Sequence, residues 1–314
     1  MHLILSITAP IFLLIFIGYI ATRTGLITPS ALAGMSKFVL YLSLPALIFS
    51  KLSVVPISAI INLQYMGAYA AGCLGAFFCA LLISHYFTKT PALLSCVKSL
   101  GSAQPNSAFI GLPVMLQFFT NPITQTFAMV LLVENILIFP LGLAMIEMAN
   151  QRSSQGFSLA ILRPVATKIL KNPIIQAVIL SVLFSVLNLE IPDFAGHALT
   201  LLGAGATPLA LIIIGGSLVG VSIRANFSDI ALVAICKLIV APLLTALVVV
   251  LAVPDMDLQL KQAVILFAAI PMFSTYPIIG GQYGLQAFCS AALLVTTVLA
   301  FFSISTVLYL IQLL

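Results

Sequence analysis

Two stretches with paired prolines decide how this sequence folds. Residues 101–119 read GSAQPNSAFIGLPVMLQFF, and residues 268–284 read AAIPMFSTYPIIGGQYG. Each stretch holds two prolines that flank polar residues, which are Pro105 and Pro113 in the first and Pro271 and Pro277 in the second. A proline removes one backbone donor and clashes with the preceding helical turn. Each stretch therefore predicts an apolar helix that is interrupted by irregular backbone.

The composition around these stretches is that of a polytopic membrane protein. Of 314 residues, 62% are hydrophobic and 6% are charged. Residues 52–88, 99–133 and 262–314 contain no Asp, Glu, Lys or Arg. Because about 20 apolar residues span a lipid bilayer, each of these regions predicts more than one crossing or a crossing with a long approach. Division at polar and turn-forming clusters predicts ten transmembrane helices, at residues 3–22, 31–50, 60–86, 91–119, 124–148, 172–189, 196–220, 228–252, 259–283 and 287–312.

The net charge of +5 indicates membrane topology rather than nucleic-acid binding, since most basic residues lie between the predicted helices. If the N-terminus is outside, the outer connections hold two basic residues, Lys51 and Lys261. The inner connections then hold seven, which are Arg23, Lys89, Arg152, Arg163, Lys168, Lys171 and Arg224. Basic residues favour the cytoplasmic side, so we predict that both termini lie outside the cytoplasm.

The prolines also indicate an internal repeat. Four pairs share an offset of 163 residues: Pro10 and Pro173, Pro29 and Pro192, Pro45 and Pro208, and Pro91 and Pro254. Because five crossings separate equivalent helices, the second copy would enter the membrane from the opposite side. We therefore predict an all-α fold of two inverted five-helix halves, residues 1–150 and 172–314, joined by a cytoplasmic connector at residues 151–171. Inverted repeats with broken helices are typical of secondary transporters.

The two breaks form the predicted substrate site. Half-helix N-termini carry partial positive charge, which favours an anionic ligand. Asn106, Ser274 and Thr275 can add neutral hydrogen bonds, while Gly111 lowers the cost of irregular backbone. The alternative is that the prolines only kink packed helices.

Two charged residues, Glu134 and Lys237, lie centrally in predicted helices, where an unpaired charge costs ~2.5 to 3.5 kcal/mol on insertion scales. Neither has a charged equivalent in the other half. We hypothesise that Lys237 places a cation near the substrate and that Glu134 pairs with it or carries a proton. The alternative is a structural ion pair between them that joins the halves. Lys98 lies closer to a helix end, and we expect its side chain to reach the headgroups.

The motifs of common enzyme and cofactor sites are absent from the sequence. It contains no P-loop, no H-E-x-x-H and no paired-aspartate motif for prenyl diphosphate chemistry. Its five cysteines lie in apolar regions without metal-ligand spacing. We therefore expect no enzymatic activity, no cofactor and no metal.

The sequence resembles the auxin efflux carrier family, which includes plant auxin exporters and bacterial malate or malonate permeases. The resemblance spans nearly the whole chain and rests on GLITPSALAGMSKFVLYLSLPALIF at 25–49, NSAFIGLP at 106–113, Asn135, KLIVAP at 237–242, and IPM followed by QYG after residue 269. It implies that the fourth and ninth helices are broken and cross at the site. A departure follows Pro271, where many members have small residues and an asparagine and this chain has Met272, Phe273 and Thr275.

Together with the resemblance, the residues predict ten substrate-binding positions: Pro105, Asn106, Gly111, Pro113, Asn135, Lys237, Pro271, Ser274, Thr275 and Tyr276. Glu134 and Lys237 are the predicted coupling residues. We expect a carrier that moves a small organic anion, such as malate, malonate or an auxin-like acid, across the bacterial inner membrane by alternating access. The resemblance implies efflux, and a homodimer is a possible assembly.

Two other functions stay open. A cation/proton antiporter using Glu134 is disfavoured, because no aspartate lies at either break. The other function, from a different functional class, is that of a membrane receptor or sensor without transport. A large soluble signalling domain would support it.

Overall fold

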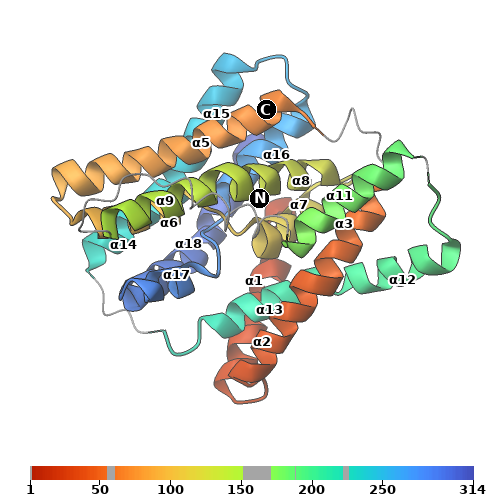
Figure 1. Cartoon of the computed structure of the whole chain (residues 1–314), viewed down its shortest axis with the longest axis horizontal. Coiled ribbons are helices and arrows are strands. Elements are labelled where there is room, and N and C mark those ends of the chain that lie inside the picture. The colour runs from red at the N-terminus through yellow and green to blue at the C-terminus, as the bar shows by residue number, and fades with distance from the viewer. Residues whose placement is uncertain (1, 55–60, 151–170, 188, 222–225) are drawn as a thin grey trace.

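A computed structural model describes residues 2–54, 61–150, 171–187, 189–221 and 226–314, and within them it contains helices and no β-strand (Figure 1). Most of the predicted connector 151–171 lies outside the described residues, as does Arg224. Seven described helical segments are long and apolar enough to cross a membrane: Leu5–Arg23, Pro29–Leu52, Leu63–Phe87, Thr124–Asn150, Asp193–Ser217, Phe227–Ala252 and Gln286–Ile311. These segments confirm the prediction of a polytopic membrane protein.

The first 150 residues form eight described α-helices: α1 (His2–Arg23), α2 (Pro29–Phe38), α3 (Leu44–Leu52), α5 (Leu63–Leu82), α6 (Ala92–Ala103), α7 (Leu112–Phe118), α8 (Thr124–Val133) and α9 (Phe139–Asn150). Four π-helical turns adjoin them: η1 (Val39–Ser43), η2 (Ile83–Phe87), η3 (Ser107–Gly111) and η4 (Glu134–Ile138). The predicted fourth helix is thus divided into α6 and the continuous η3–α7 segment.

The described helices after residue 170 are α11 (Pro173–Val186), α12 (Asp193–Ala204), α13 (Ala206–Ser217), α14 (Phe227–Ile235), α15 (Ala241–Ala252), α16 (Leu258–Ala269), α17 (Tyr276–Gln282) and α18 (Gln286–Ile311). One π-helical turn, η6 (Cys236–Val240), joins α14 to α15. The predicted ninth helix is divided into α16 and α17.

Helix packing depends on small residues where two backbones meet closely. α1 lies along α13, and an added Cβ at Gly215 would lie 1.8 Å from the Ile15 carbonyl oxygen. In the same interface, an added Cβ at Gly18 would lie 2.2 Å from the Ile212 carbonyl oxygen. Such close approach is the usual way in which membrane helices gain packing energy.

The described helices form two packing groups. In the first, α1 packs on α13, and α3 packs on α11 and α12. In the second, α5 packs between α6 and α15, while α18 contacts α14, α16 and α17. Figure 1 shows α5 and α15 on one side of the molecule, with α2 and α13 on the other. The broken segments lie where the two groups meet: α6 and α16 pack on α5 and α17 packs on α18, whereas α7 and η3 contact α1 and α13 of the first group.

Candidate functional site

The two broken segments pair with each other through their backbones. Gln104 and Ile270, which end α6 and α16, both have extended backbone conformations. The Asn106 amide donates to the Pro271 carbonyl oxygen at 2.8 Å, and the Phe273 amide donates to the Gln104 carbonyl oxygen at 3.2 Å. Lipid offers no partners for backbone groups that leave a helix. At this crossing, each break supplies such partners to the other.

The four prolines have two different positions around the crossing. Pro105 and Pro271 lie within the breaks, where Pro105 faces Met272 in an antiparallel bridge. Pro113 and Pro277 instead lie at the starts of α7 and α17. At α17 the proline is tolerated because the amide has no helical partner, whereas Pro113 directly follows the π turn η3 within the continuous η3–α7 segment. The interruptions are therefore shorter than the proline spacing predicted.

Gly111 has a packing role at the end of η3. A Cβ on Gly111 would lie 2.9 Å from Phe267 Cε1 and 3.4 Å from Ile270 Cγ1. Glycine thus lets the segment after one break approach the helix before the other. The sequence analysis expected Gly111 to ease irregular backbone, and this close contact adds a packing reason for the glycine.

Glu134 is buried beside the crossing and accepts hydrogen bonds from two hydroxyl groups. Tyr69 Oη donates to Glu134 Oε1 at 2.6 Å, and Ser107 Oγ donates to the same oxygen. Gln104 Nε2 donates to Oε2 over a longer distance of 3.4 Å. All three partners are donors, which suits an ionised carboxylate because it can only accept. The sequence analysis missed these partners, although Ser107 and Gln104 both lie next to the proline break.

Glu134 and Lys237 each contact the end of a half-helix that belongs to one of the broken segments. Ser107, which binds Glu134, is the first residue of the η3–α7 segment, so the carboxylate lies at a positive helix end. Lys237 Nζ donates to the Ala268 carbonyl oxygen at 3.1 Å, in the last turn of α16, where the helix end is negative. The two side chains form no ion pair within 4 Å in the described structure. The alternative of a direct structural ion pair is therefore not realised.

These residues lie in π-helical turns, which the sequence did not predict. Ser107 belongs to η3, Glu134 to η4 and Lys237 to η6. A π turn inserts one extra residue and often occurs at functional sites. The three turns thus place the side chains of Ser107, Glu134 and Lys237, from three separate helical segments, near the crossing.

Two buried polar atoms at the crossing have no hydrogen-bond partner among the described residues. They are Gln104 Oε1 and Asn106 Nδ2. The other amide atom of Asn106 is used, since its Oδ1 accepts from the Phe109 amide at 3.3 Å and caps η3. An unsatisfied buried polar atom costs about 1–3 kcal/mol. One donor and one acceptor without partners therefore make this crossing the candidate binding site.

The remaining predicted site residues are less well placed. Asn135 Nδ2 donates to the Leu131 carbonyl oxygen at 2.8 Å, and its Oδ1 accepts from Asn172 at 3.5 Å, near the start of α11. Tyr276 Oη donates to the Val97 carbonyl oxygen at 2.9 Å, so its hydroxyl is engaged within the protein. Ser274 is half-buried and Thr275 is exposed. The structure thus brings Pro105, Asn106 and Pro271 together with Glu134.

The prediction that Lys98 reaches the headgroups is wrong. Its side chain is fully buried and forms an ion pair with Asp229, in the first turn of α14. Lys98 Nζ also donates to Thr90 Oγ1 at 3.0 Å. Because Asp229 lies 131 positions away in sequence, only the packing of α6 beside α14 reveals the pair. A second polar contact between distant helical segments joins Tyr283 to Glu147.

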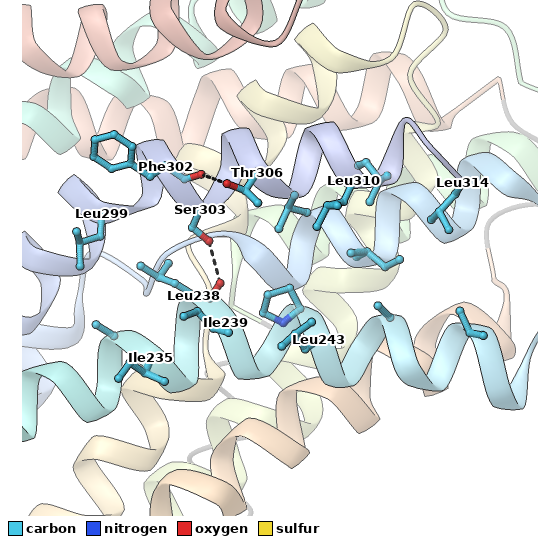
Figure 2. Close-up of a pocket in the computed structure, with 17 residues that line it drawn as sticks. Ile235, Leu238, Ile239, Leu243, Leu299, Phe302, Ser303, Thr306, Leu310 and Leu314 are labelled. Atoms are coloured by element: carbon cyan, nitrogen blue, oxygen red, sulfur yellow. Dashed lines mark hydrogen bonds between the residues drawn. The ribbon is translucent and has the colours of Figure 1, made fainter. Parts of the chain in front are cut away.

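An apolar groove of about 620 Å³ lies away from the crossing, between η6–α15 and α18 (Figure 2). Figure 2 shows that its two labelled hydroxyl groups are directed to backbone carbonyls. Ser303 Oγ donates to the Leu238 carbonyl oxygen, and Thr306 Oγ1 donates to the Phe302 carbonyl oxygen, both at 2.8 Å. This lining suits hydrocarbon rather than an organic anion.

Comparison with known proteins gives a matching family and several relatives, including the two that follow. Residues 3–309 match the family described as membrane transport protein. The chain is 25% identical over 310 residues to the "Putative malonate transporter" of Rhizobium meliloti (strain 1021), covering 98% of this chain and 96% of that protein. It is also 25% identical over 243 residues to the "Lysosomal cholesterol signaling protein" of Mus musculus, covering 74% of this chain and 28% of the mouse protein. Because the match covers nearly its whole length, the chain belongs to the membrane transport protein family, the auxin efflux carrier-like family that its sequence resembles.

Proposed function

We propose that this protein is a carrier for a small organic anion, with malonate as the first candidate substrate. The observation that carries this proposal is the buried crossing, where Asn106 Nδ2 has no hydrogen-bond partner among the described residues. A donor in that position suits a carboxylate. The name of the Rhizobium relative supports malonate, while malate and auxin-like acids are the other candidates. Efflux is the direction that the family resemblance suggests.

We further propose ten transmembrane helices in two inverted halves, residues 1–150 and 172–314, with the connector at 151–171. Three shorter parts of the described structure supplement the seven long segments: α6 with η3–α7, α11, and α16 with α17. Lys98 and Lys261, 163 residues apart, also make similar local contacts. Lys98 Nζ reaches Thr90, eight residues earlier, and Lys261 Nζ reaches the Pro254 carbonyl oxygen, seven residues earlier.

In this proposal, the protein spans the bacterial inner membrane, both termini lie outside the cytoplasm, and the connector lies in the cytoplasm. Alternating access comes from movement of one packing group against the other around the site, as in other carriers with inverted repeats. A homodimer remains a prediction. The ten residues named above form the proposed substrate-binding set, and Asn106 has the leading part.

Glu134 is the proposed coupling residue. Its carboxylate already occupies the positive end of the η3–α7 half-helix, through Ser107. An organic anion beside Asn106 would therefore face a like charge in a medium of low dielectric constant, which is unfavourable. Protonation of Glu134 removes that repulsion, so we expect anion binding to be linked to proton uptake. Lys237 supplies the balancing cation at the end of α16.

The test is exchange of malonate in proteoliposomes that contain the full chain. Uptake of labelled malonate into vesicles loaded with unlabelled malonate is measured at equal internal and external pH, with malate and indole-3-acetate as competitors. Equal pH removes the driving force of a proton gradient and leaves only the effect on binding and translocation. We expect exchange to rise as the pH falls through the titration of Glu134.

Glu134→Gln provides the control, because it keeps the titration of malonate itself and removes that of the protein carboxyl. We expect this variant to lose the component of the pH dependence that the protein contributes. Absence of exchange for all three anions would contradict the carrier, and an unchanged pH profile in Glu134→Gln would contradict the coupling role. Sodium- or proton-driven cation flux without anion exchange would favour the antiporter.

One observation favours a receptor as the second candidate function. An alignment that covers 74% of this chain, at 25% identity, relates it to a protein named as a signalling protein. A receptor without transport would bind an anion or a sterol and show no exchange. Equilibrium binding of labelled malonate and of cholesterol to the same reconstituted protein separates this possibility from a carrier.

A further inference from the structure

We infer that Gln104 is a positioning residue that turns its side-chain amide according to the charge of Glu134, and so links proton binding to the crossing of the two broken segments. This inference rests on the proposed role of Glu134 as the coupling residue. It adds a second residue, which the sequence analysis did not single out, and a route by which the charge reaches the binding site.

The two oxygens of Glu134 have unequal partners. Oε1 accepts from both Tyr69 Oη and Ser107 Oγ, whereas the nearest donor to Oε2 is Gln104 Nε2 at 3.4 Å. Oε2 is therefore the oxygen with room for a proton. A protonated carboxyl becomes a donor and needs an acceptor.

Gln104 has that acceptor next to Oε2. Its Oε1 is buried and has no hydrogen-bond partner in the described structure. Rotation of the terminal amide exchanges the Nε2 donor for the Oε1 acceptor without movement of the backbone, because this torsion is broad and nearly two-fold. One orientation thus suits the ionised carboxylate, and the other suits the protonated carboxyl.

The other titratable groups that interact with Glu134 come from α5 and η6. They are Tyr65, Tyr69 and Cys73 from α5, and Lys237 from η6. Tyr69 is engaged at Oε1, and Lys237 Nζ is bonded to the Ala268 carbonyl oxygen. Among the described contacts, none of these four groups makes a hydrogen bond to Oε2.

Gln104 also belongs to the backbone pairing at the crossing. Its carbonyl oxygen accepts from the Phe273 amide at 3.2 Å. Two residues later, Asn106 pairs with Pro271 and carries the unpaired Nδ2 donor. The Gln104 side chain, whose orientation depends on the charge of Glu134, is therefore attached to the backbone that forms the proposed anion site.

The first test measures the pH profile of malonate exchange in Gln104→Met, which keeps the length of the side chain and removes both amide atoms. Methionine removes the bond to both forms of Glu134, but the Nε2 bond to the ionised form is long, at 3.4 Å, so its loss offsets only part of the lost bond to the protonated form. We therefore expect the midpoint of the profile to move toward acid by up to about one pH unit. Gln117→Met is the matched control, since Gln117 lies on the same broken segment but is exposed. Its profile should equal that of the unmodified protein.

The second test does not depend on transport. The infrared C=O band of protonated Glu134, identified by its loss in Glu134→Gln, is titrated in the purified full chain in lipid. We expect the same acid shift of its midpoint in Gln104→Met. If that variant does not fold, Gln104→Asn, whose shorter amide cannot reach Oε2, should give the same shift.

The two measurements separate the inference from the proposed function. A shifted infrared titration without any anion exchange would support the role of Gln104 while the carrier proposal fails. If Gln104→Met leaves both the pH dependence of exchange and the infrared titration unchanged, the role of Gln104 is overturned while the carrier proposal stands.

Discussion

The buried ion pair of Lys98 and Asp229 predicts unequal effects when either partner is removed. Lys98 is 0% exposed, whereas Asp229 is 14% exposed. Asp229→Asn removes the counter-charge and leaves the buried ammonium with neutral acceptors, which are the new amide oxygen and Thr90 Oγ1. Lys98→Met leaves the carboxylate, which can still reach water or headgroups. We therefore expect Asp229→Asn to be the more damaging change.

The magnitudes follow from these surroundings. An uncompensated charge from a broken buried pair costs about 3–5 kcal/mol, which we expect for Asp229→Asn. Methionine fills nearly the volume of the lysine stem, and the carboxylate that remains is partly hydrated, so Lys98→Met should cost about 1–2 kcal/mol. The double variant removes both charges and should be more stable than Asp229→Asn alone.

The assay is thermal unfolding of the detergent-solubilised protein with a thiol-reactive dye. Cys73, Cys96, Cys236 and Cys289 are buried and become reactive on unfolding, while Cys79 is partly buried. Lys37→Met serves as the control, because Lys37 is exposed and its loss should leave the unfolding midpoint nearly unchanged. The reasoning is refuted if Lys98→Met lowers the midpoint as much as Asp229→Asn, or if the double variant is the least stable.

Three further substitutions test the packing and the site. Gly215→Ala should lower stability by about 3 kcal/mol, because its Cβ would lie 1.8 Å from the backbone oxygen of Ile15. Gly67→Ala, where no heavy atom lies within 4 Å of the added carbon, should gain up to about 1 kcal/mol; equal unfolding midpoints would contradict the packing. Asn106→Asp keeps the acceptor that caps η3 but replaces the unpaired donor with a charge, so malonate exchange should fall about tenfold or more, and undiminished exchange would exclude Asn106 from the site.

Much of the membrane architecture could be predicted because its signals are local. Apolar length predicted the spanning segments, and the prolines at 105 and 271 predicted where two helices break. The sequence did not show how long the breaks are, since Pro113 and Pro277 are compatible both with a break and with the first turn of a helix. The π turns at Ser107, Glu134 and Lys237 also carried no recognisable signal.

The candidate site was predicted only in part. Asn106 and Glu134 stood out because a polar or charged residue in an apolar helix needs a reason. Tyr69 did not, since a tyrosine in an apolar segment is equally compatible with packing. Asn135 and Tyr276 were chosen with the family resemblance and their sequence positions, but their side chains bond to the Leu131 and Val97 carbonyl oxygens.

By itself, the sequence determined that the chain spans a membrane, where two helices are interrupted, and which charges are costly to bury. These properties depend on neighbouring residues and on the solvent that surrounds a helix. The tertiary structure alone decided the partners of those charges. The partners of Glu134 are Tyr69 and Ser107, the partner of Lys237 is the end of α16, and the partner of Lys98 is Asp229. The physical reason is that a buried charge is stabilised by whichever group helix packing brings within a few ångströms, however distant that group is in sequence.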